Sequence, residues 1–205
     1  MLDRESFGDV IDTLSGEGAF VSLAERSFTR DARAHSQHTE VRVQVLVPRR
    51  AIGPDDLRLA GDGLLDLGDE GDARYLGMGW FRSEAVGGAQ ARWAGDGTTS
   101  VVRLTPPNGA EDGATLTVRT AAYPPDQRVT LRVNGVELET HTLTPDWAEY
   151  TWRIPRGVLG TREIAEIELV HARAVSAYDL TGGASPDQRP LAAAYDWVRL
   201  TAAAP

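Results

Sequence analysis

The chain has 205 residues, of which 41% are hydrophobic and 25% are charged, and its formal net charge is −9. This length suits one packed domain with a short extension. The negative charge disfavours nucleic acid as a partner, because phosphate binding needs a basic surface. No window reaches the roughly 18 consecutive apolar residues that span a bilayer, and the first residues lack the pattern of a signal peptide, so we expect no direct membrane insertion.

Two residue types are missing from the composition. The chain has no cysteine, and all 21 of its basic residues are arginine. These absences exclude a disulfide framework, a thiol nucleophile, a lysine Schiff base and a phosphate-binding P-loop. The sequence also lacks the Gly-x-Ser-x-Gly and HExxH motifs of common hydrolases, so it predicts a protein that is not an enzyme.

The first fifty residues differ in pattern from the rest. A first helical pattern is formed by Phe7, Val10, Ile11 and Leu14. A second helical stretch is predicted over Leu23–His35. A strand is predicted over Val41–Val47, where apolar residues alternate until Pro48. Residues 1–50 therefore read as a helical or irregular N-terminal extension or linker that contains one strand.

Residues 51–205 alternate with the period of β-strands. Asn134-Gly135 joins two such runs and predicts a tight hairpin, because both central residues of that turn need positive φ. Trp152 and Trp197 lie inside alternating runs and are predicted core residues. No helix-length pattern separates the runs, so we predict an all-β antiparallel sandwich. The clearest runs cover residues 114–118, 129–133, 148–154 and 167–169.

One short segment combines the side chains that bind sugars. Trp80 and Trp93 offer flat faces on which a sugar ring stacks, Arg92 offers several donors, and Glu84 accepts hydrogen bonds from hydroxyl groups. These four residues are the predicted carbohydrate-binding site.

Several segments, taken in order, resemble the galactose-binding-like jelly-roll domain. Such domains occur at the C-terminal end of bacterial membrane glycosyltransferases and of sulfatase- or phosphodiesterase-like proteins. The likeness covers about residues 61–200 and rests on the ordered set, since each motif alone is weak. The matching segments are Asp66-Leu67-Gly68, Tyr75–Trp80, Glu84, Ala91–Ala94, Val129–Gly135, Asp146–Tyr150, Ile154-Pro155 and Ser185–Leu200.

The resemblance implies a jelly-roll β-sandwich over residues 51–205 and a non-catalytic module. It implies carbohydrate recognition, or packing beside a catalytic domain or protein subunit, within a bacterial glycan-processing protein of the cell envelope. An extracytoplasmic location follows from the same resemblance. In relatives that bind calcium, an acidic residue of the closing strand is a ligand, which makes Asp196 the candidate here, together with Asp66 or Asp69.

Two other functions remain open at this point. The chain could be a structural or assembly subunit that docks on partner proteins through the sandwich and the N-terminal extension, with no glycan ligand. It could also be a hydrolase that uses carboxylates such as Glu84 and Asp196, which depends on their separation in the fold.

Overall fold

The structure is a computed structural model that describes residues 20–31, 38–48, 52–69, 71–160 and 162–203. The chain divides into two compact units, residues 1–53 and 54–205. No helix among these described residues is long and apolar enough to cross a membrane.

The N-terminal unit contains a two-stranded antiparallel hairpin. Strand β1 (Phe20–Asp31) pairs with β2 (His38–Pro48), with Phe28 opposite Val41. The strand predicted over Val41–Val47 is confirmed. The helical stretch predicted over Leu23–His35 is wrong for residues 23–31, because pairing with β2 satisfies this backbone as a strand and outweighs a weak helical spacing. The helical pattern of residues 7–14 lies outside the described residues.

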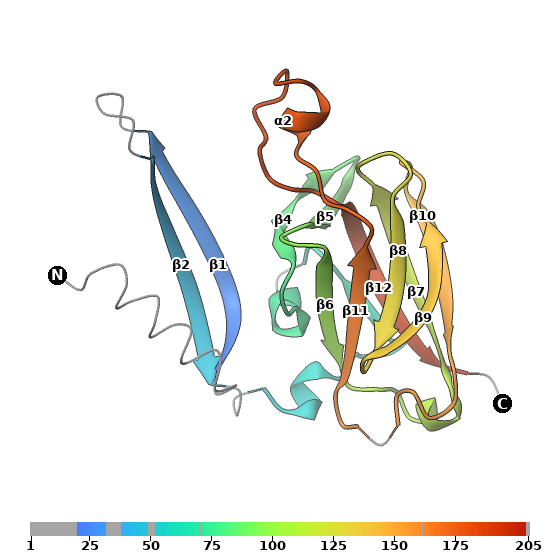
Figure 1. The fold of residues 1–205 in the computed structure, drawn as a ribbon. Coiled ribbons are helices and arrows are strands. Elements are labelled where there is room, and N and C mark those ends of the chain that lie inside the picture. Colours follow the sequence, from blue (N-terminus) through green and yellow to red (C-terminus); the bar gives the residue numbers. More distant parts are fainter. Residues whose placement is uncertain (1–19, 32–37, 49–51, 70, 161, 204–205) are drawn as a thin grey trace. The chain divides into compact units, whose positions relative to one another are not determined.

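The second unit is an antiparallel jelly-roll β-sandwich (Figure 1), as predicted. Its larger sheet has the order β10-β7-β12-β5-β4, and β3 pairs with the same edge of β12 as β5. The strands of this sheet are β3 (Leu64–Asp66), β4 (Trp80–Val86), β5 (Ala89–Ala94), β7 (Ala114–Ala122), β10 (Ala148–Ile154) and β12 (Ala193–Ala202).

The smaller sheet has the order β6-β11-β8-β9. Short helices lie in the connections: η2 (Pro54–Leu57), η3 (Asp72–Tyr75), η4 (Ala110–Asp112) and α2 (Ala177–Leu180). The strands of the smaller sheet are β6 (Thr99–Leu104), β8 (Arg128–Val133), β9 (Val136–Thr142) and β11 (Ala165–His171).

The strand and turn signals of the sequence are confirmed. Each of the four alternating runs lies in a strand of the sandwich, and Val133 pairs with Val136 across the predicted turn. Asn134 and Gly135 have φ of 52° and 84°, the left-handed conformation that a type I′ hairpin requires.

The core lies between the two sheets, and a bulge in β12 decides which residues reach it. Trp152 is fully buried there, as predicted. Trp197 was predicted to lie in the core, and this is wrong: it is half-buried on the outer face of the larger sheet. The pairing shifts between Tyr195 and Trp197, so the extra residue Asp196 reverses the alternation. Tyr195, which is fully buried, occupies the inward position instead.

Candidate functional site

Trp80 lies between the two sheets. Its Nε1 donates a hydrogen bond to the carbonyl oxygen of Val101 in β6 at 2.8 Å, and its ring meets the ring of Tyr195 edge-on, with centroids 5.4 Å apart. Both partners belong to the sandwich core. The ring of this predicted site residue therefore packs against the core.

Arg92 also turns toward the interior, where it pairs with Asp72 of η3. Its Nε donates to Oδ2 of Asp72 at 2.5 Å and its Nη2 to Oδ1 at 2.6 Å, while Nη1 donates to the carbonyl oxygen of Phe81 at 3.0 Å. The side chain of Asp72 is 1% exposed. All three guanidinium nitrogens of Arg92 thus serve contacts within the fold.

Trp93 and Glu84 lie on the opposite, outer face of the larger sheet. Arg92 is opposite the inward Tyr195 in the β5–β12 pairing, so the next residue, Trp93, points outward. Glu84 pairs with Ala91, which is two residues from Trp93 and shares its face. The structure therefore separates the four predicted carbohydrate-binding residues into an inner pair and an outer pair.

The connection between β11 and β12, residues 172–192, brings further polar residues to Glu84 and Trp93, the outer pair. Its two limbs are joined by reciprocal backbone hydrogen bonds of 3.0 Å between Val175 and Leu191, and Tyr178 N–H donates to the carbonyl oxygen of Asp187 at 2.8 Å. Asp187 in turn accepts a hydrogen bond from the backbone N–H of Arg189 at 3.0 Å. These bonds fix the positions of the Asp187 and Arg189 side chains.

Arg189 joins this connection to β4. Its Nη2 donates to Oε1 of Glu84 at 2.9 Å and to Oδ2 of Asp187 at 2.7 Å, and its guanidinium lies 5.5 Å from the ring centroid of Phe81. Trp93 meets Tyr123 edge-on at 5.5 Å between centroids. We refer to this aromatic pair and the residues around Arg189 together as the Arg189 cluster: Phe81, Glu84, Trp93, Tyr123, Asp187 and Arg189.

The electrostatics of the cluster follow from Arg189. Its hydrogen bonds hold the pKa of the Asp187 carboxyl below its usual value, and the same carboxylate raises the pKa of Arg189. Burial, and then the charge of Asp187, raise the pKa of the Tyr123 phenol. At neutral pH the cluster therefore presents ionised Asp187, cationic Arg189 and a phenol that keeps its proton.

The cluster has the components of a sugar-binding surface. Trp93 and Tyr123 supply aromatic area, and the charged side chains of Glu84, Asp187 and Arg189 are 32%, 30% and 34% exposed, within reach of a ligand. Sequence reasoning named Trp93 and Glu84 but missed Tyr123, Asp187 and Arg189. Asp187-x-Arg189 just before the closing strand was the available signal, because this spacing lets an aspartate accept from the arginine backbone.

The predicted calcium ligands have other neighbours. Asp196 forms an ion pair with Arg119, whose guanidinium lies 5.2 Å from the ring centroid of Trp147. Burial, followed by the charges of Asp69, Asp196 and Asp72, raises the pKa of Asp66. In the part of the chain that the structure describes, no three acidic or histidine side chains are grouped so that they could hold a metal ion. The calcium site at Asp66, Asp69 and Asp196 therefore stays a prediction.

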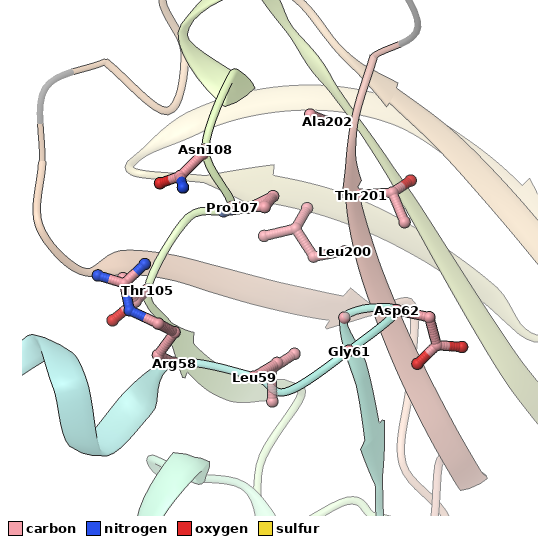
Figure 2. Close-up of a pocket in the computed structure, with 11 residues that line it drawn as sticks. Arg58, Leu59, Gly61, Asp62, Thr105, Pro107, Asn108, Leu200, Thr201 and Ala202 are labelled. Atoms are coloured by element: carbon pink, nitrogen blue, oxygen red, sulfur yellow. The ribbon is translucent and has the colours of Figure 1, made fainter.

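A pocket of about 350 Å³ lies beside the C-terminal end of β12 (Figure 2). Leu59, Pro107 and Leu200 form its centre, with Arg58 on one side and Asp62 on the other. Asp62 forms an ion pair with Arg199, with 3.1 Å between Oδ2 of Asp62 and Nη2 of Arg199. Because Leu200 is near the end of β12 and Arg189 precedes its start, this pocket and the Arg189 cluster lie at opposite ends of that strand.

Comparison with known proteins gives structural likeness alone. No family model matches the chain, and no curated protein matches it. Matching solved structures include a carbohydrate-binding module CBM36 in complex with calcium and xylotriose, at 14% identity and a TM-score of 0.40, covering 67% of this chain and 98% of that one.

Two further matches are of the same kind. The module CsCBM6-3 from Clostridium stercorarium, in complex with cellobiose, has 15% identity and a TM-score of 0.39, covering 71% of this chain and 100% of that one. The Podospora anserina GH26-CBM35 β-(1,4)-mannanase has 14% identity and a TM-score of 0.43, covering 71% of this chain and 29% of that one. These likenesses concern the β-sandwich and say nothing about the ligand of this chain.

Proposed function

We propose that this protein is a non-catalytic carbohydrate-binding module and that the Arg189 cluster is its binding site. The observation that carries the proposal is that the aromatic pair of Trp93 and Tyr123 and the ion pairs of Arg189 with Glu84 and Asp187 are both found in the Arg189 cluster. Sugar recognition needs aromatic area for the C–H groups of a ring, with donors and acceptors for its hydroxyls beside it. The cluster combines both on one surface.

The charged groups of the site are arranged for binding. The carboxylates of Glu84 and Asp187 are both bound to Arg189, which keeps them as acceptors for hydroxyl hydrogens. Asp196, the other carboxylate considered for hydrolysis, is paired with Arg119. In this arrangement each of the three carboxylates has an arginine partner, which favours recognition over acid–base catalysis.

Replacing Trp93 or Tyr123 by alanine is expected to weaken glycan binding at least about tenfold, because each substitution removes aromatic area at the centre of the site. Binding is measured by affinity electrophoresis in gels that contain β-glucan, xylan, mannan or galactan, and the free energy of unfolding is measured on the same samples.

Tyr178→Ala is the matched control, because Tyr178 is an exposed tyrosine of the same connection outside the cluster. We expect this variant to bind like the natural chain. Unchanged binding by both cluster variants, with all proteins folded, would show that the Arg189 cluster is not the site.

We propose further that the module serves a bacterial glycan-processing protein of the cell envelope. The sequence resemblance to C-terminal jelly-roll domains of membrane glycosyltransferases supports this. An antibody against residues 54–205 is expected to detect a band far above 22.2 kDa in the membrane fraction of native cells. A band at 22.2 kDa in the soluble fraction contradicts this association.

A second candidate function is that of an assembly subunit, which exposed apolar side chains favour. Tyr178 and Leu180, both in α2, are each 45% exposed, and Met78 is 69% exposed. The two exposed side chains of α2 are close in sequence, and neighbouring exposed apolar side chains are typical of protein contacts. Stable co-purification with a partner that is lost in Tyr178→Ala, without affinity for any glycan of the panel, would favour this function.

A further inference from the structure

The charges of the Arg189 cluster do not sum to zero. Two carboxylates, those of Glu84 and Asp187, share one guanidinium, so the group carries a formal charge of −1. Arg189 holds the pKa of Asp187 below its usual value, so this carboxylate stays ionised at neutral pH. The three charged residues of the cluster therefore present one negative charge in excess.

The guanidinium of Arg189 is also largely used by the fold. Nε donates to both oxygens of Asp187, at 3.1 and 3.2 Å, and Nη2 donates to Glu84 and Asp187. A carboxylate or sulfate binds arginine best through two parallel N–H groups. The two such edges of a guanidinium are Nε with Nη2 and Nη1 with Nη2, and both include the nitrogen that Glu84 and Asp187 already occupy.

An uncharged sugar meets no such obstacle. Its hydroxyl hydrogens can be donated to Glu84 and Asp187, and a hydroxyl oxygen can accept from Nη1 of Arg189, which has no acceptor among the described residues. Its ring can stack on Trp93 or Tyr123, and this contact needs no charge. Each group of the cluster thus has a use with a neutral sugar.

We propose that the Arg189 cluster selects uncharged glycans and rejects uronate and sulfated ones. This inference rests on the proposed carbohydrate-binding function and adds the ligand class. Like charges placed together across an interface weaken binding, and this effect falls as salt screens it. Glu84 and Asp187 are therefore specificity-determining residues as well as acceptors.

The test compares each polysaccharide with its own oxidised form. β-1,3-glucan, β-1,4-mannan and β-1,4-galactan are each used unmodified and after oxidation of the C6 hydroxyl to a carboxylate. We expect the natural chain to bind the unmodified form at least about tenfold more tightly at low salt, with a smaller difference at about 500 mM NaCl.

The variant Glu84→Gln removes one negative charge and keeps an amide oxygen to accept from Arg189. We expect this variant to bind the oxidised form more tightly, so that the ratio of its affinities for the unmodified and oxidised forms is severalfold smaller than that of the natural chain. Glu111→Gln is the matched control, because Glu111 is an exposed glutamate in η4, outside the cluster. This control should show the same ratio of affinities for the unmodified and oxidised forms as the natural chain.

The outcomes separate the two proposals. Equal or tighter binding of the oxidised forms by the natural chain overturns the selectivity and leaves carbohydrate binding intact. Discrimination that is the same in Glu84→Gln as in the natural chain also overturns it. If the folded natural chain binds no form of any of these polysaccharides or of xylan, carbohydrate binding itself fails, and the selectivity with it.

Discussion

Replacing Arg92 by alanine is expected to lower the free energy of unfolding by about 3 kcal/mol, because the carboxylate of Asp72 then remains buried without its counter-charge. The side chains of Arg92 and Asp72 are 16% and 1% exposed, and two hydrogen bonds of 2.5 and 2.6 Å join them. The measurement is urea-induced unfolding of the natural chain and the variant at pH 7.

The matched control is Arg156→Ala, which breaks an ion pair of a different kind. Arg156 pairs with Asp112 at 3.1 Å, but their side chains are 81% and 68% exposed. Exposed pairs contribute between about 0 and 1 kcal/mol because water solvates the carboxylate that remains after the change. We therefore expect this variant to unfold nearly like the natural chain.

The same experiment tests the role that the sequence predicted for Arg92. If Arg92 were a ligand-binding residue at the surface, its substitution would lower the affinity of the protein for glycan and leave the urea midpoint of unfolding unchanged. An unchanged urea midpoint together with lost binding would thus favour the sequence prediction over the contacts with Asp72 and Phe81.

The sequence predicted the strands well because their signals are local. Val129–Val133 alternates with period two, and Asn134-Gly135 carries the positive φ angles of the turn that follows. Both features depend on neighbouring residues alone. The sandwich fold then follows from the number of strands and the lack of helices between them.

The faces of the strands were harder to predict because they depend on register. Trp197 differs from Tyr195 by two positions, and uninterrupted alternation would place both on one face. The bulge at Asp196 separates them, and it arises where β5 and β3 meet end to end along β12. Nothing local to the sequence marks that junction.

The composition of the site depends on contacts across long stretches of sequence. Glu84 and Arg189 are 105 positions apart and meet because the connection before β12 returns to β4. Arg92 and Trp93 are neighbours in sequence and yet point to opposite faces of the sheet. Four residues of suitable type in one segment of the sequence therefore do not form one surface: Glu84 and Trp93 lie on the outer face of the larger sheet, and Trp80 and Arg92 turn toward the interior.

Acidification is expected to destabilise the fold by about 3 kcal/mol between pH 6.5 and pH 4 through His171 alone. This side chain is buried in β11, where its Nε2 and the Tyr195 hydroxyl are 2.9 Å apart and its Nδ1 lies 3.2 Å from the carbonyl oxygen of Thr98. Burial lowers the pKa of His171 from 6.5 to about 4. The folded protein therefore keeps this imidazole neutral at pH values where water would protonate it.

The sign follows from proton uptake. Below pH 6.5 the unfolded chain binds a proton at His171 that the folded chain does not. The free energy of unfolding therefore falls by about 1.4 kcal/mol for each pH unit of acidification. The stability is complete above pH 6.5 and is lost as the pH falls toward 4, where the folded protein also protonates. Carboxylates titrate in the lower part of this range in every variant, so a difference between two proteins isolates the histidine.

His171→Gln supplies that difference, because glutamine keeps a polar group near Tyr195 and does not titrate. Urea unfolding at half-unit steps from pH 7.5 to 4.5 should give a free energy that falls more steeply for the natural chain than for the variant below pH 6.5. His141, which packs against Trp152 with centroids 4.6 Å apart, is present in both proteins and cancels. Parallel pH profiles would mean that His171 takes up its proton inside the fold, and that burial does not hold the imidazole in its neutral form.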